Sequence, residues 1–169
     1  INFGLIYGMS AFGLARQLDL ERGAAQAYID RYFARYPGVA RYMEDTREAA
    51  RAKGYVETVF GRRLWLPEIR ASQAGRRQGA ERAAINAPMQ GTAADLIKLA
   101  MVAVQNWIER EALQSRLLLQ VHDELILEVP DTELARVRAE LPPLMTQVAQ
   151  LRVPLVVEVG VGANWDEAH

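Results

Sequence analysis

Helical periodicity dominates the first third of the chain. Apolar residues recur there at the spacing of a helix face, and the stripes predict helices over residues 1–8, 11–18, 21–36 and 38–53. Pro37 suits the first turn of the last of these helices, and Gly54 can close it as a left-handed C-cap.

Two later segments have the pattern of β-hairpins. YVETVFGRRLWLP, residues 55–67, alternates between apolar and polar positions around Phe60-Gly61. LLLQVHDELILEV, residues 117–129, places His122-Asp123-Glu124 between two apolar runs. This arrangement indicates two strands with the three polar residues at or near their turn.

Prolines fall within the two remaining predicted helices. A long helical stretch covers residues 77–113, and we expect Pro88 to interrupt it. Another helix begins at Asp131-Thr132, and we expect Pro142-Pro143 to kink or split it. VPLVVEVGVG, residues 153–162, has the composition of a strand.

These elements predict an α+β fold with two subdomains. We expect residues 1–76 to form helices plus a hairpin, and residues 77–169 to hold the long helix, the polar hairpin, a helix and a C-terminal strand. The sequence contains no internal repeat, low-complexity tract or linker, and no apolar run reaches membrane-spanning length.

Composition narrows the cellular setting. The chain has 169 residues, of which 50% are hydrophobic, enough for one domain with a substantial core. It has no cysteine, which excludes disulfides and thiolate metal sites and favours the reducing cytoplasm. INFGLIYG opens the chain without Met and already inside an apolar pattern, so we expect a fragment of a longer protein.

Basic residues are concentrated in one stretch, although the net charge is only −1. Between positions 62 and 82, Glu68 and Glu81 are outnumbered by Arg62, Arg63, Arg70, Arg76, Arg77 and Arg82. A local excess of this kind suits contact with phosphate groups. A solvated basic face is the competing interpretation.

A row of polar residues follows the same stretch. Arg82, Asn86 and Gln90 are spaced four apart and therefore share one helix face if the helix continues through Pro88. Such a face either contacts a ligand or lies in water, and the spacing alone does not decide between them.

The carboxylates of the polar hairpin are the main candidates for chemistry. An Asp-Glu pair offers the hard oxygen ligands that Mg²⁺ prefers, while water and substrate phosphate fill its other positions. Because neighbours in a strand point to opposite faces, Asp123 and Glu124 cannot easily hold the same ion. A second strong ligand would come from elsewhere, and Glu128 and Glu158 qualify by type alone. A solvated polar turn is the alternative, and His122 has no neighbouring Ser or Cys to activate as a catalytic base.

Five stretches of the chain carry a family resemblance. In order they are INFGLIYGMS, GYVETVFGRRLWLP, ERAAINAPMQGTAAD, LLLQVHDELILEV and NWDEAH. They resemble, in the family's own order, the C-terminal end of the bacterial DNA polymerases of the A family. INFGLIYGMS is similar to the latter part of the fingers-helix motif, and LLLQVHDELILEV is similar to the palm carboxylate motif.

The resemblance implies a fold and an activity. The fold would be a partial right hand, with most of the fingers and the C-terminal part of the palm. The activity would be template-directed transfer of a nucleotide from a dNTP to a primer 3′-OH, with two Mg²⁺ ions, in the replication and repair of bacterial chromosomal DNA.

The resemblance also implies roles for individual residues. Asp123 would bind metal, and Glu124 would be a supporting catalytic acid at the primer end. Phe3 and Tyr7 would line the nucleotide pocket, and Phe at position 3 goes with discrimination against dideoxynucleotides. The residues that would contact primer-template DNA are Ser10, Phe12, Arg82, Asn86, Gln90, Gln120 and His122.

The family's other metal-binding aspartate, and the Arg and Lys that hold the triphosphate, lie upstream of these stretches. We therefore expect the isolated chain to be inactive and to need the remainder of its polypeptide. Three alternatives stay open: a non-catalytic nucleic-acid-binding module, a metal-dependent nuclease and a structural part of a larger assembly. A binding module would hold DNA in a salt-sensitive way, whereas a nuclease would need a closed carboxylate cluster within the chain.

Overall fold

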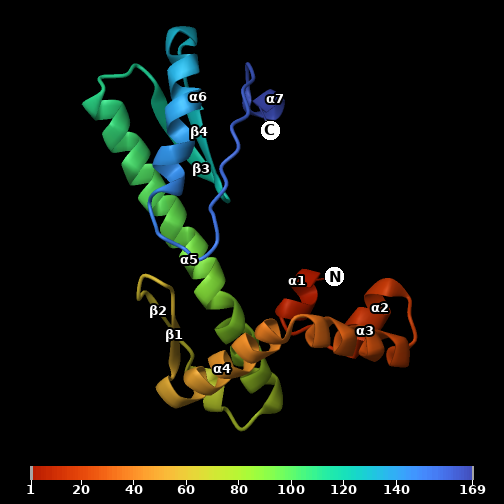
Figure 1. Ribbon diagram of the computed structural model, residues 1–169. Helices are drawn as coiled ribbons and strands as arrows, with labels where there is room; N and C mark the ends of the chain where they lie inside the picture. The colour runs from red at the N-terminus through yellow and green to blue at the C-terminus, as the bar shows by residue number, and fades with distance from the viewer. Residues whose placement is uncertain (1, 169) are drawn as a thin grey trace. The chain divides into compact units, whose positions relative to one another are not determined.

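The computed structural model describes residues 2–168, with side chains from residue 4 onward, and Figure 1 shows the order of the elements. The chain divides into two compact units, Ile1–Thr92 and Ala93–His169. The described residues are mostly helical, with one two-stranded antiparallel sheet in each unit. Helices combined with antiparallel strands agree with the α+β prediction.

The first helices of unit 1 share one hydrophobic cluster. They are α1 (Asn2–Ile6), α2 (Ala11–Leu18) and α3 (Arg22–Arg35). The side chains that they bury together are Leu5, Leu14, Ala25 and Ile29. The rings of Tyr28, Tyr32 and Phe33 on α3 are half-buried and pack against this cluster, whereas Tyr36, which follows the helix, is 49% exposed.

The rest of unit 1 is built around a second cluster. Its elements are α4 (Pro37–Lys53), β1 (Tyr55–Glu57), β2 (Arg63–Trp65), the 3-10 helix η1 (Pro67–Arg70) and the first part of α5 (Ala74–Arg110). Gly54 ends α4 with a φ of 81°, and Gly61 turns the hairpin with the same φ, which glycine adopts without steric cost. The predicted C-cap and the predicted first hairpin are therefore confirmed.

The expected interruption at Pro88 is wrong, because α5 runs through it. A proline removes one hydrogen bond of the helical ladder, here the bond to the carbonyl of Ala84. Tertiary packing outweighs this loss, since Ala84 and Ile85 are fully buried and the Tyr42 hydroxyl donates a 2.9 Å hydrogen bond to the Ile85 carbonyl. The Thr92 hydroxyl also donates to the Pro88 carbonyl, at 2.5 Å.

Unit 2 packs the end of α5 against a hairpin and a helix. The hairpin is β3 (Arg116–Val121) with β4 (Glu124–Glu128), and the helix is α6 (Asp131–Thr146). Figure 1 shows these three parts side by side, and they bury Val104, Trp107, Ile108, Val137 and Leu141. The predicted second hairpin is confirmed.

A carboxylate joins the start of β3 to the first turn of α6. Glu133 accepts hydrogen bonds from the backbone N–H of Gln114 at 2.8 Å and of Ser115 at 2.9 Å, and from the Ser115 hydroxyl at 2.6 Å. The Ser115 hydroxyl bond is the main reason that the pKa of Glu133 is lowered. Ser115 is 2% exposed, so Glu133 satisfies polar groups that would otherwise be buried without partners.

Two further expectations for unit 2 are wrong. Pro142-Pro143 do not split α6, which continues to Thr146. Leu144 and Met145, which follow the prolines, pack against the same core as Val137 and Leu141 and hold the last turn in place. Residues 153–162 form no strand. A strand needs a neighbouring strand to hydrogen-bond with, and this segment has none among the described residues. Its burial nevertheless alternates as in a sheet, with half-buried Leu155, Val157 and Val159 between exposed neighbours. After this segment comes the short helix α7 (Trp165–Ala168).

Within the part of the chain that the structure describes, no helix combines the length and apolar character needed to cross a membrane.

Candidate metal and nucleic-acid sites

The β3–β4 hairpin places His122 and Asp123 at its tip. Val121 pairs with Glu124, so the turn contains only these two residues. His122 has a φ of 52°, in the left-handed region that favours glycine, whereas Asp123 has a negative φ. The Gln120 amide donates a 2.8 Å hydrogen bond to the His122 carbonyl, which ties the end of β3 to the turn. The structure therefore brings three predicted site residues, Gln120, His122 and Asp123, to one tip.

The two carboxylates at this tip differ in their surroundings. Asp123 is exposed, whereas Glu124 is half-buried and accepts a hydrogen bond from the indole N–H of Trp165 at 3.4 Å. Among residues 2–168, no group of three or more His, Cys, Asp or Glu side chains could hold a metal ion. Glu128, at the far end of β4, and Glu158 therefore do not complete a cluster with Asp123.

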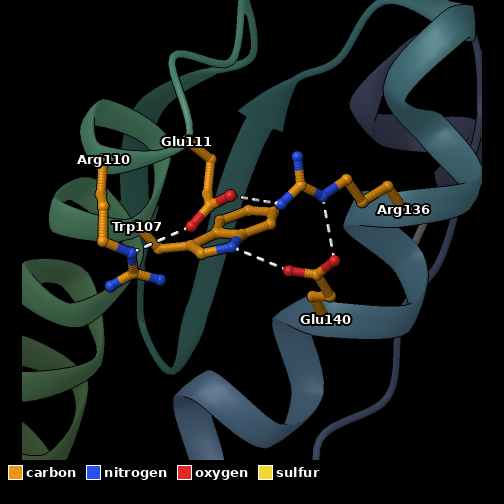
Figure 2. Close-up of polar contacts among 5 residues, drawn as sticks. All are labelled: Trp107, Arg110, Glu111, Arg136 and Glu140. Atoms are coloured by element: carbon orange, nitrogen blue, oxygen red, sulfur yellow. Dashed lines mark hydrogen bonds and ion pairs between the residues drawn. The ribbon is translucent and has the colours of Figure 1, made fainter.

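A polar network joins the end of α5 to α6 (Figure 2). The indole N–H of the buried Trp107 donates to Glu140 at 2.9 Å, and Arg136 donates to the other oxygen of Glu140 at 2.9 Å and to Glu111 at 2.6 Å. Arg110 also donates to Glu111, at 3.0 Å. Arg136 is the main cause of the lowered pKa of both glutamates.

The polar row on α5 keeps its alignment because the helix continues through Pro88. Arg82 and Gln90 are exposed, and no other described residue pairs with the Arg82 guanidinium. Asn86 is half-buried, and its Oδ1 atom has no hydrogen-bond partner among the described residues. A buried acceptor without a partner is unfavourable by about 1–3 kcal/mol, so a donor from a ligand at this face would be stabilising. Gly8, which follows α1, lies beside this row, because a Cβ atom built on it would be 3.6 Å from the Arg82 side chain.

All five of the other arginines of the basic stretch have structural partners. Arg70 donates to the carbonyls of Arg51 at 2.6 Å and Ala52 at 2.8 Å, and so closes the C-terminus of α4. Arg63 pairs with Glu57 at 2.9 Å. The remaining ones, Arg62, Arg76 and Arg77, bond to Gly91, Glu68 and Ala71 respectively. The charge excess did not distinguish among these six arginines, whereas the structure leaves only the Arg82 guanidinium without a partner among the described residues.

The predicted site residues near the N-terminus differ in their exposure and contacts. Ser10 is the N-cap of α2, where its hydroxyl accepts a 3.2 Å hydrogen bond from the Gly13 N–H. Phe12 is 66% exposed, and Tyr7 is half-buried. The side chain of Phe3 lies outside the described residues.

Comparison with known proteins places these features in a family. Residues 1–167 match the model of DNA polymerase family A. The chain belongs to this family. It is 64% identical over 169 residues to DNA polymerase I of Pseudomonas aeruginosa, covering 100% of this chain and 18% of that protein. It is 54% identical to DNA polymerase I of Chloroflexus aurantiacus, covering 99% of this chain and 18% of that protein.

A solved structure agrees with the family assignment. The polymerase domain of Pol1 from M. smegmatis, in complex with DNA primer-template and dNTP, superposes with a TM-score of 0.96 at 47% identity. The superposition covers 99% of this chain and 30% of that one. The chain thus corresponds to less than a fifth of the two family A relatives named above.

Sequence reasoning missed the contact between Trp165 and Glu124, which lie 41 residues apart. The closing NWDEAH stretch was noticed as a family motif, but no periodicity or spacing connects it to the hairpin. The network around Trp107 was likewise not visible, because it depends on how α6 packs on α5.

Proposed function

We propose that this chain supplies part of the polymerase site of a bacterial DNA polymerase I. The reaction is template-directed transfer of a nucleotide from a dNTP to a primer 3′-OH. The observation that carries the proposal is the β3–β4 tip, where a tight turn presents the exposed Asp123 carboxylate next to Glu124. Family A membership and the similarity to a polymerase domain bound to DNA and dNTP support the same function.

The proposed subdomains follow from the family resemblance. Residues 1–76 belong to the fingers and residues 77–169 to the palm of a right-hand fold. Phe3 and Tyr7 line the nucleotide pocket, while Ser10 and Phe12 lie along the template. Ser10 would combine this role with its N-cap bond, and the 66% exposure of Phe12 is compatible with contact to DNA.

Primer-template contacts are proposed for two further groups. The first is the α5 row of Arg82, Asn86 and Gln90. Neither the Arg82 guanidinium nor the Asn86 amide oxygen has a partner among the described residues, which supports this contact. The second is Gln120 with His122 at the hairpin, where the imidazole is exposed.

The chemistry of the tip fits a divalent cation. Asp123 provides one exposed hard-oxygen ligand at a turn, the donor type that Mg²⁺ takes from proteins. Two bound Mg²⁺ ions would stabilise the attacking and leaving oxygens of the transfer. Because the described residues hold no cluster of three metal ligands, we expect the isolated chain to be inactive.

Primer extension with magnesium tests the proposal on three samples. They are this chain alone, the complete polymerase that contains it, and the complete polymerase carrying Asp123→Asn. We expect extension only by the unchanged complete enzyme. Magnesium-dependent incorporation by the isolated chain would contradict our expectation that this chain is inactive alone. An undiminished rate for Asp123→Asn would show that Asp123 is not a metal ligand.

DNA binding by the same three samples distinguishes the proposed function from its main alternative, a non-catalytic nucleic-acid-binding module. A non-catalytic nucleic-acid-binding module would bind primer-template with unchanged affinity after Asp123→Asn and in the absence of magnesium. Its binding would fall only with added salt. Arg82 supports such binding as well as it supports catalysis, so the extension assay, not DNA affinity, decides between the two.

A further inference from the structure

Glu124 is held at a defined point by a residue from the end of the chain. It is the first residue of β4, half-buried, and its Oε2 atom accepts the 3.4 Å hydrogen bond from the Trp165 indole. A bond to one carboxylate oxygen limits the rotation of the side chain and so restricts the directions in which the other oxygen, Oε1, can point. Trp165 therefore contacts the carboxylate next to the proposed metal ligand Asp123.

The segment that carries Trp165 is itself fixed by reciprocal hydrogen bonds. The Asn164 side-chain oxygen accepts from the Glu167 N–H at 3.1 Å, and the Asn164 amide donates back to Glu167 at 2.9 Å. Glu167 also accepts from the Ala163 N–H at 3.1 Å. These bonds resemble a capping box, which sets the direction in which a helix starts. They hold Trp165 at the first position of α7.

Two glycines leave room for this tail. A Cβ atom on Gly160 would collide with the carbonyl oxygen of Ala168, and one on Gly162 would lie 2.6 Å from the Glu167 Cβ. Separations this short do not occur between real atoms, so any other residue at these positions would displace α7. α7 can fold back against residues 160 and 162 because neither residue has a side chain.

We infer that Trp165 is a positioning residue for the polymerase reaction: its indole N–H sets the orientation of Glu124 at the primer end. The inference rests on the proposed function and extends it to the end of the chain. Trp165 touches neither substrate nor metal in this account, and it acts only through Glu124. Its loss therefore affects the reaction step more than the binding of DNA or dNTP.

Single-nucleotide incorporation by the complete polymerase tests the inference. Trp165→Phe removes the N–H donor and keeps an aromatic ring, and the matched control Trp65→Phe makes the same change at an exposed tryptophan of unit 1. We expect Trp165→Phe to slow incorporation at saturating dNTP about tenfold, below the ~10²-fold loss that a 1 Å misplacement can produce. The Kd values for DNA and dNTP should change less than about twofold, and Trp65→Phe should leave all three quantities unchanged.

Coupling to Glu124 separates positioning from general packing. If Trp165 acts through Glu124, Trp165→Phe added to Glu124→Ala causes no further loss of rate, whereas independent effects would add. Hydrogen exchange in the enzyme without metal gives a second readout. Glu124→Ala and Gly160→Ala should both accelerate exchange of the Glu167 and Ala168 amides, which α7 protects.

The outcomes distinguish this inference from the proposed function. A full rate for Trp165→Phe beside an inactive Asp123→Asn refutes the inference and leaves the proposed function standing. Additive losses with Glu124→Ala, or unchanged exchange of the tail in Glu124→Ala, also refute it. A full rate for Asp123→Asn refutes the proposed function and the role of Trp165 with it.

Discussion

Replacement of Trp107 by alanine tests how unit 2 is held together. Trp107 is 1% exposed and lies in a cluster with Val104, Ile108, Val137 and Leu141. Trp→Ala changes in cores destabilise by about 3–5 kcal/mol. Burial of about 150–250 Å² of aromatic surface at about 25 cal/mol per Å² gives about 4–6 kcal/mol, in agreement. The lost bond to Glu140 adds little, because that carboxylate keeps Arg136 and reaches water.

Native-state hydrogen exchange in the complete polymerase measures this loss. A decrease of about 4 kcal/mol in the free energy of opening accelerates exchange of the α6 amides about a thousandfold. The control Trp65→Ala removes a tryptophan that is 63% exposed and touches Tyr55, and it should change local stability by less than about 1.5 kcal/mol. Acceleration of less than about tenfold in α6 would refute the assignment of Trp107 as the centre of this core.

Three further predictions address charge and substrate choice. Arg82→Gln should lower DNA affinity and reduce the slope of log Kd against log salt concentration by about 0.9, as expected for one lost phosphate contact. The control Arg77→Gln should leave this slope unchanged, because the Arg77 guanidinium bonds to the Ala71 carbonyl. Arg136 lowers the pKa of Glu111 and Glu140, and Ser115 lowers the pKa of Glu133, below the ordinary 4.5. The ionised carboxylates therefore stabilise the folded state above pH 4.5, and this contribution is lost as the pH falls through the lowered pKa values. Urea unfolding at a series of acid pH values should therefore show a free energy of unfolding that decreases as the pH is lowered. Arg136→Met should make this decrease smaller. An equal pH dependence in the unchanged protein and in Arg136→Met would contradict the role given to Arg136. Phe3→Tyr in the complete enzyme should raise dideoxynucleotide incorporation, and an unchanged termination ratio would place Phe3 outside the sugar pocket.

Local signals in the sequence predicted the elements that depend on local physics. Gly54 and Gly61 marked a cap and a turn because both need positive φ, and both have it. Pro88 and Pro142-Pro143 were misread as breaks, because the missing hydrogen bonds matter less than the buried side chains around them. Residues 153–162 were misread as a strand because composition cannot show whether a pairing partner is present.

The candidate site was also predictable only in part, because sequence patterns do not show tertiary contacts. Two acids and a histidine in an apolar run were expected at or near a turn, since their burial in the strands would be costly. The hairpin places His122 and Asp123 in the turn and Glu124 at the first position of β4. The partner of Glu124 was not predictable, because Trp165 reaches it through tertiary packing of the tail. Asn86 was selected by helical spacing, but its unsatisfied amide oxygen is a property of the packed structure.

The backbone at His122 opposes stability to the proposed activity in any engineered polymerase that contains this chain. A φ of 52° is uncommon for a residue other than glycine or asparagine and is unfavourable by about 1 kcal/mol. Gly or Asn at this position would relieve the strain, so a thermostability library would favour them. Either substitution would also discard the imidazole that we propose contacts the primer-template. Position 122 should therefore be held constant in such libraries, and a gain in melting temperature obtained there should be scored first by primer extension.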